Sequence, residues 1–224
     1  MEEVNKNYEI KCGDCLELIK DIKDKSIDCI ITDPPYFLGV THNGREGNYI
    51  DLAIMKPFFE QLFFEFKRVI KDNGCIYIFC DWRTYPFHFP IFEKIIGLKN
   101  LLVWAKHGRP TQTYYGNGYE LIMFSGKIRK PYISNIIENI KSFNAFSVEN
   151  KKLNGEKIHP TQKPIELVEK LILDSTKENE TVLDCFMGSG STGVACIKNN
   201  RRFIGYELDE NYYKNAEIRI KKFL

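Results

Sequence analysis

The chain has 224 residues, 43% of them apolar, and this length favours a single domain with one substantial core over residues 1–224. A formal net charge of +2 excludes a protein that binds nucleic acid through its overall positive charge alone. No apolar run approaches the length of a membrane span, and no basic segment followed by an apolar one opens the chain. We therefore expect a cytoplasmic protein with no membrane partner.

The pattern of apolar residues predicts alternating strands and helices. In the first half we expect strands at 8–11, 28–32 and 75–80 and helices at 15–22, 52–70 and 91–96, with Gly74 ending the long helix. In the second half we expect a hairpin-like pair of strands at 101–104 and 120–124, a helix from Pro164, strands at 182–184 and 203–207 with a helix between them, and a last helix at 209–222. This order predicts an open, mostly parallel α/β sheet with helices on both faces.

The tetrapeptide Asp33-Pro34-Pro35-Tyr36 follows the apolar run 27–32. An exocyclic amine of a nucleobase is a poor nucleophile because its lone pair is delocalised into the ring. A carboxylate and a main-chain carbonyl, here those of Asp33 and Pro34, would favour a tetrahedral nitrogen if both accepted its N–H groups. The prolines add no competing N–H donor, and Tyr36 offers a ring for stacking. The tetrapeptide thus predicts alkylation of a planar amine, although a simple strand-ending turn has the same composition.

A glycine-rich turn follows the strand expected at 182–184. Gly188, Gly190 and Gly193 match G-x-G-x-x-G, and Glu207 ends the next strand, where a carboxylate can bind ribose hydroxyls. Two observations argue against a dinucleotide: Asp184 would repel a pyrophosphate, and only seventeen residues follow Glu207. A nucleoside with a cationic, zwitterionic tail, such as S-adenosylmethionine, suits the acidic strand end better. A tight turn without a ligand is the alternative.

A third segment, His159-Pro160-Thr161-Gln162-Lys163-Pro164, precedes the helix expected from Pro164. A proline at a helix start explains Pro164 but not the residues before it. With this segment, the chain resembles the DNA amino-methyltransferases that modify adenine N6 or cytosine N4, in their circularly permuted β-class order. That order places the catalytic segment first, the target-recognition segment in the middle and the cofactor loop last. The resemblance covers most of the chain and implies a Rossmann-like, S-adenosylmethionine-dependent methyltransferase fold.

The resemblance also implies roles for individual residues. The catalytic set is Asp33, Pro34, Pro35 and Tyr36, and the cofactor-binding set is Asp14, Thr161, Lys163, Asp184, Phe186, Gly188, Ser189, Gly190 and Glu207. In this scheme Glu207 binds the ribose, Asp184 the methionine ammonium, and Thr161 and Lys163 the carboxylate end. Asp14 lies near the adenine edge, but it could instead cap the helix that follows. Lys163 could equally be a solvated lysine.

Residues 127–157 form the expected target-recognition segment. From Lys127 to Lys163 the chain has eight lysine or arginine residues against three acidic ones, with aromatic residues interleaved, although an exposed loop can also be basic. The glycine-rich stretch 37–50 is expected to close over a flipped base. Double-stranded DNA is the expected partner, and a homodimer and a cognate restriction endonuclease are further candidates.

The expected reaction is methylation of adenine N6 in a short specific sequence, for restriction–modification or related DNA marking. Asp at the first position of the tetrapeptide resembles the adenine enzymes, whereas Ser is typical of cytosine-N4 enzymes. Cytosine C5 chemistry is disfavoured because no cysteine follows a proline. The alternatives are cytosine-N4 methylation, methylation of RNA or of a protein glutamine, and a catalytically silent DNA-binding module. The seven cysteines include one isolated C-x-x-C, Cys12 to Cys15, and we expect no metal.

Overall fold

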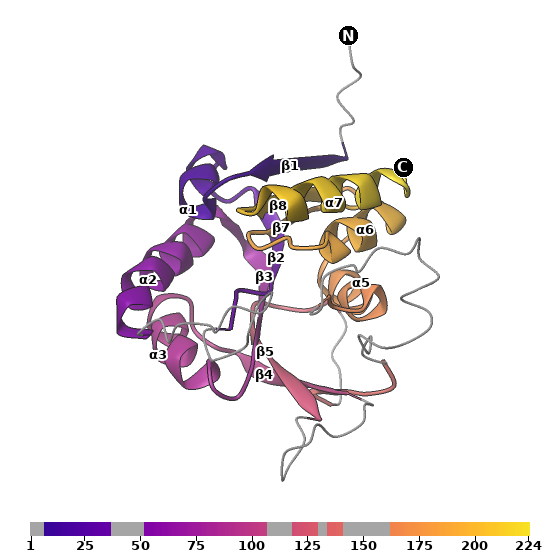
Figure 1. The fold of residues 1–224 in the computed structure, drawn as a ribbon. Helices are drawn as coiled ribbons and strands as arrows, with labels where there is room; N and C mark the ends of the chain where they lie inside the picture. The colour runs from indigo at the N-terminus through magenta and orange to yellow at the C-terminus, as the bar shows by residue number, and fades with distance from the viewer. Residues whose placement is uncertain (1–6, 37–51, 107–117, 130–133, 141–161) are drawn as a thin grey trace.

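The protein forms one eight-stranded sheet with helices packed on both faces, as seen in a computed structural model that describes residues 7–36, 52–106, 118–129, 134–140 and 162–224 (Figure 1). The strands are β1 (Tyr8–Cys12), β2 (Ile27–Thr32), β3 (Ile70–Cys80), β4 (Asn100–Ala105), β5 (Tyr119–Ser125), β6 (Ile136–Ile137), β7 (Thr181–Asp184) and β8 (Arg202–Glu207). Their order is β1-β8-β7-β2-β3-β5-β4-β6, and β5 is the one of these eight that runs antiparallel to its neighbours. The expected mostly parallel sheet is confirmed.

The helices form two layers around the sheet. They are α1 (Cys15–Leu18) with the short 3₁₀ turn η1 (Ile19–Asp21), α2 (Leu52–Val69), α3 (Tyr85–Ile95), α5 (Ile165–Ser175), α6 (Ser191–Lys198) and α7 (Glu210–Lys221). Helices α1, α2 and α3 cover one face and α5, α6 and α7 the other (Figure 1). An apolar core lies between each helix layer and the sheet. The core under α1, α2 and α3 is rich in phenylalanine, and the core under α5, α6 and α7 is rich in aliphatic side chains. Strand β2 is buried along its whole length, which explains its nearly continuous apolar sequence.

The strands that precede the tetrapeptide at 33–36 and the glycine-rich turn lie next to each other at the centre of the sheet. Strands β2 and β7 pair in parallel, with Cys29 opposite Val182 and Ile30 opposite Leu183. Their carboxyl ends therefore reach the same edge, where ligands bind in open α/β sheets. The prediction that these two strands lie side by side is confirmed.

The end of the long helix differs from the expectation. Helix α2 ends at Val69, and Gly74 lies within β3 rather than at a helix end, so that prediction was wrong. Strand β3 bulges there, because Ile27 of β2 faces Ile70 whereas Cys29 faces Cys75. A Cβ on Gly74 would lie 2.9 Å from the Asp28 carbonyl oxygen, so the bulge needs glycine for its close approach to β2.

Two further elements were missed or misplaced by the sequence analysis. Helix α3 begins at Tyr85 instead of residue 91, with Pro86 in the first turn, where its missing N–H costs no hydrogen bond. The short strand β6 lies inside the expected recognition segment and pairs with β4.

Cysteine behaves as a core residue here. All seven cysteines are free, and all of them except Cys12 are buried. Within the described ranges, no three His, Cys, Asp or Glu side chains gather as a metal site would require. None of the helices in those ranges has the length and apolar character needed to cross a bilayer.

Candidate active site

A cavity of about 740 Å³ opens at the carboxyl edge of the central strands. Of the expected site residues, it is lined by Asp14, Asp33, Pro34, Pro35, Tyr36, Lys163, Asp184, Phe186, Gly188, Ser189 and Glu207. Gly190 lies outside this lining, and Thr161 lies outside the described residues. The structure thus brings together segments that are about 150 residues apart in the sequence.

At one end of the cavity, Asp33 follows β2 directly and leaves one carboxylate oxygen available. Asp33 Oδ1 and the Tyr36 hydroxyl are both buried and make no hydrogen bond of good geometry in the described part of the chain, although the hydroxyl lies near enough to lower the pKa of Asp33. Buried polar atoms are rarely left without partners, and such atoms are often matched by a ligand or by water. This end of the cavity therefore offers a carboxylate oxygen and a phenol to an incoming polar group.

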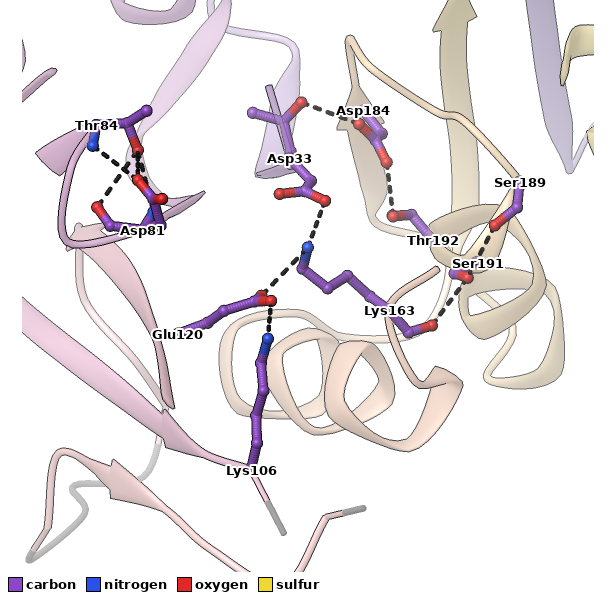
Figure 2. A network of polar contacts seen from close by, with 11 residues as sticks. Asp33, Asp81, Thr84, Lys106, Glu120, Lys163, Asp184, Ser189, Ser191 and Thr192 are labelled. Atoms are coloured by element: carbon purple, nitrogen blue, oxygen red, sulfur yellow. Dashed lines mark hydrogen bonds and ion pairs between the residues drawn. The ribbon is translucent and has the colours of Figure 1, made fainter. Parts of the chain in front are cut away.

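A network of buried charges surrounds the second oxygen of Asp33 (Figure 2). The Lys163 ammonium donates to Asp33 Oδ2 and lies 3.2 Å from Glu120 Oε2. Lys106 donates to the other oxygen of Glu120. Lys163 also lies near two aromatic rings, 5.0 Å from the centroid of Phe79 and 5.5 Å from that of Tyr36. Its side chain is only 8% exposed, so this lysine is not the solvated residue that the sequence allowed.

The network shifts the pKa values of Asp33, Glu120 and Lys163. Burial raises the pKa of Asp33 above its usual range, against the opposing effect of the Lys163 ammonium. For Glu120, burial acts in the same direction, but Lys163 and Lys106 outweigh it and lower the pKa. Burial alone would lower the pKa of Lys163, yet the two carboxylates raise it. Two carboxylates and two ammonium groups thus balance one another beside the cavity.

Glu120 and Lys106 were not singled out in the sequence. Glu120 is the second residue of β5, and because β5 runs antiparallel, its first residues reach the edge where the other strands end. Lys106 follows the last residue of β4 and reaches the same edge. The predicted hairpin could have indicated Glu120. The start of an antiparallel strand lies at the same edge as the ends of the parallel strands, so an acidic residue there lies beside the acidic residues that end those strands.

Asp184 lies at the end of β7, between the tetrapeptide at 33–36 and the glycine-rich turn. It accepts hydrogen bonds from Thr32 Oγ1 at 2.9 Å, Thr192 Oγ1 at 2.7 Å and the Phe186 N–H at 3.1 Å. Burial raises the pKa of Asp184 to about 6, although these donors oppose the rise. The carboxylate is therefore held in one orientation beside the cavity.

The glycine turn after β7 is tied to the neighbouring strand by Glu207. Its two carboxylate oxygens accept from the Gly188 N–H at 2.8 Å and the Asp209 N–H at 2.9 Å. Gly188 has a positive φ of 52°, and a Cβ there would meet only the Phe186 carbonyl oxygen, at 3.9 Å. A ligand could therefore approach the backbone of this turn closely. Gly190, at φ 75°, instead packs against α7, where a Cβ would lie 3.0 Å from that of Ala216.

Asp14 marks the other end of the cavity. It caps α1 by accepting from the Leu16 N–H at 2.8 Å, which was the structural alternative for this residue, and it also lines the cavity. Arg219 of α7 braces the glycine turn, donating to the Ser189 carbonyl oxygen at 2.9 Å and facing the Gln162 amide.

The cavity fits a ligand with a nucleoside and a cationic tail. The carboxylates of Glu207 and Asp14 lie along one part of it, and those of Asp184 and Asp33 along another. The open space over Gly188 and the unpartnered Asp33 oxygen are features that a bound ligand would use. The segments expected to contact DNA, 37–50 and most of 127–157, lie outside the described residues. Arg129, which is described, donates to the Thr176 carbonyl oxygen and so packs against the end of α5.

Comparison with known proteins agrees with this geometry. A family model for N6 and N4 enzymes, described as DNA methylase, matches residues 27–218. Type II methyltransferase M2.LlaDCHI of Lactococcus lactis subsp. cremoris is 31% identical over 240 residues, which cover 94% of this chain and 88% of that protein. DNA adenine methyltransferase YhdJ of Escherichia coli (strain K12) is 30% identical over 232 residues, covering 90% and 79%.

A solved structure supports both the fold and the cofactor. The crystal structure of the M1.HpyAVI complex with S-adenosylmethionine superposes with a TM-score of 0.70 at 28% identity, covering 95% of this chain and 98% of that one. The family model spans most of the present chain, including the tetrapeptide at 33–36 and the glycine turn. The chain therefore belongs to the N6/N4 DNA methylase family and is an S-adenosylmethionine-dependent DNA methyltransferase.

Proposed function

We propose that this methyltransferase modifies N6 of an adenine that is flipped out of a short, specific DNA sequence. The observation that carries the proposal is Asp33 Oδ1, a buried carboxylate oxygen without a hydrogen-bond partner among the described residues. It lies in the cavity beside Tyr36, at the first position of the tetrapeptide that holds the amine. Relatives such as the adenine methyltransferase YhdJ support the choice of base.

In this proposal the chain's own residues make the amine reactive. Asp33 and the Pro34 carbonyl accept the two N–H groups, Pro35 keeps the turn free of a competing donor, and Tyr36 stacks on the base. The bound cofactor supplies an electrophilic methyl group on sulfur. The amine nitrogen forms its new bond to that methyl carbon as the carbon–sulfur bond breaks, and the nitrogen then loses a proton, which Asp33 is placed to accept. Base flipping brings the amine to this turn.

The cofactor roles are proposed as follows. Glu207 binds the ribose, Asp14 the adenine edge and Asp184 the methionine ammonium, while the glycine turn lies against the cofactor. Phe186, Gly188, Ser189 and Gly190 form that turn. Thr161 would contact the carboxylate end. The same was expected of Lys163, but its contacts with Asp33 and Glu120 favour a role on the base side.

The wider context also remains a proposal. We take residues 1–224 as a single methyltransferase domain that binds double-stranded DNA through a recognition segment at 127–157. The type II relatives support a role in restriction–modification with a cognate endonuclease, and a homodimer would add contacts to a short recognition segment. A protein whose substrate is genomic DNA would act in the bacterial cytoplasm.

Methyl transfer to genomic DNA tests this function directly. The purified protein is incubated with unmethylated genomic DNA and methyl-labelled S-adenosylmethionine, and the digested nucleosides are analysed by mass spectrometry. We expect label in N6-methyladenine. Label in N4-methylcytosine would keep the mechanism but change the base, whereas binding of cofactor and DNA without label would favour a silent binding module.

An asparagine at position 33 tests the catalytic role. Asp33→Asn should retain cofactor binding and lose turnover, because an amide accepts a hydrogen bond from the amine more weakly and carries no charge. Asp28→Asn is a matched control on the same strand, since Asp28 pairs with Lys71 at the opposite end of β2. Full activity of Asp33→Asn would contradict the assignment.

A further inference from the structure

We propose that Lys163 and Glu120 are positioning residues for methyl transfer: Lys163 is the counter-ion of Asp33, and Glu120 holds Lys163 in place. The inference rests on the proposed role of Asp33 as the acceptor for the amine. It gives Lys163 a function on the base side of the cavity, and it adds a residue of β5 to the site.

The geometry divides the two oxygens of Asp33 between two tasks. Lys163 donates to Oδ2, whereas Oδ1 is buried without a partner in the described ranges. A base amine can therefore take Oδ1 while the ammonium stays on Oδ2. The negative charge that the amine needs is maintained without blocking the oxygen that accepts from it.

The surroundings of Asp33 make a counter-ion necessary. Apart from Lys163, the ionisable groups that face it in the described structure are those of Glu120, Tyr36, Asp184 and Cys80. Each of these is either negative or neutral, and burial disfavours a charged Asp33 further. Without Lys163, Asp33 would be a partly buried acid beside the negative charge of Glu120, which favours its protonated form.

Glu120 Oε2 faces Lys163 from the opposite side in an ion pair of 3.2 Å that lacks hydrogen-bond geometry. Glu120 also forms an ion pair with Lys106, which favours its charged form. Among the described residues, Lys106 forms no ion pair with Asp33. The Lys163 ammonium lies near the rings of Phe79 and Tyr36, and its side chain is almost fully buried, so solvent competes little for this position. The ammonium is thus held between two carboxylates from different strands.

Charge-removing variants test the inference. Lys163→Met should lower kcat on genomic DNA roughly 10- to 100-fold at pH 7, because Asp33 becomes protonated. The activity of this variant should recover as the pH is raised. Adding Glu120→Gln removes the neighbouring negative charge, so the double variant should be more active at pH 7 than Lys163→Met alone. A purely structural role predicts that two buried changes are additive or worse.

Two control variants and two control measurements complete the test. Lys163→Arg retains the charge and should keep the wild-type pH profile. Lys71→Met breaks an ion pair with Asp28 remote from the cavity and should change neither kcat nor the pH profile. Thermal unfolding and binding of S-adenosylhomocysteine, by calorimetry, show whether each variant is folded.

The outcomes are distinct. A Lys163→Met enzyme with the wild-type pH profile, or a double variant no better than Lys163→Met, would overturn the inference. So would weakened binding of S-adenosylhomocysteine without a change of pH profile, because Lys163 would then serve the cofactor. Failure of the proposed function would appear separately, as wild-type protein that leaves no label in DNA or as an active Asp33→Asn enzyme.

Discussion

Thr32 and Asp184 are joined across the two central strands by a 2.9 Å hydrogen bond from the threonine hydroxyl to the carboxylate. This contact links the strand that leads into the tetrapeptide at 33–36 with the strand that leads into the glycine turn. The parts of the cavity lining that follow these two strands therefore share one buried acid, Asp184, whose pKa burial raises to about 6.

Cofactor affinity should depend on the charge of Asp184. Burial raises its pKa to about 6, so the carboxylate gains a proton as the pH falls below that value. A neutral acid attracts an ammonium less, and we expect the Kd for S-adenosylhomocysteine to rise about tenfold from pH 7 to pH 5. Titration calorimetry across this range checks it. Asp184→Asn should bind more weakly at pH 7 and lose the pH dependence.

Thr32→Val removes one donor to Asp184 at nearly constant volume. The pKa of Asp184 should rise further, so that the midpoint of the pH-dependent binding moves to higher pH. The free energy of unfolding should fall by about 1 kcal/mol through loss of the buried hydrogen bond. Urea unfolding and calorimetry measure the two effects, and an unchanged midpoint would show that Thr32 does not tune the acid.

Gly188→Ala should impair binding more than folding. The positive φ costs about 1–2 kcal/mol with a side chain, but the methyl group meets no atom closer than 3.9 Å and enters the cavity. We expect a clear loss of cofactor affinity in a folded protein.

Gly193→Ala is the matched comparison within the same segment. Its Cβ would lie 2.5 Å from Ile220 Cδ1 and 2.8 Å from the Phe203 ring, so the core must shift at a cost of about 1–3 kcal/mol. Stability should fall, while binding by the folded fraction should stay near the wild-type value. Equal effects of the two substitutions on binding would contradict this division of roles.

His88 should make the protein less stable at acid pH. Its ring is fully buried against Phe59, neither ring nitrogen has a partner in the described structure, and burial lowers the pKa to about 4. Between pH 6.5 and about pH 4, His88 binds a proton in the unfolded chain but not in the folded protein. The free energy of unfolding therefore falls as the pH drops through this range. The loss is about 2 kcal/mol at pH 5.

A leucine at position 88 tests this by removing the titrating group. The difference in unfolding free energy between pH 7.5 and pH 5 should shrink by about that amount in His88→Leu, as measured by urea titration. The same pH dependence in both proteins would assign the acid sensitivity to other groups.

The sequence predicted those site residues that lie at the ends of parallel strands. Asp33, Asp184 and Glu207 each end an apolar run, and parallel strands bring such ends to one edge. Glu120 was not predicted as a site residue because it lies at the start of a strand. Only the reversed direction of β5 brings it to that edge. The ion pairs of Lys163 with Asp33 and Glu120 were not predicted either, because the sequence around Lys163 does not indicate which acids it contacts.

Local signals failed where tertiary contacts decided the structure. Glycine after a helix normally marks its end, but Gly74 serves a bulge whose existence depends on the register with β2. The start of α3 was placed too late because Pro86 and Pro90 interrupt the apolar pattern, although the helix accommodates both. The antiparallel pair of β4 and β5 was predicted correctly from two adjacent apolar runs.

The lining of the cavity acts as an electrostatic filter. In its described part, Asp14, Asp33, Glu120, Asp184, Glu207 and Asp209 face a single cation, Lys163. Such a lining repels a phosphodiester but admits an uncharged base or a positively charged ligand. Under the proposed function, this lining would keep the DNA backbone at the rim while one nucleobase enters, so the same acids would also set how deep the nucleic acid can enter.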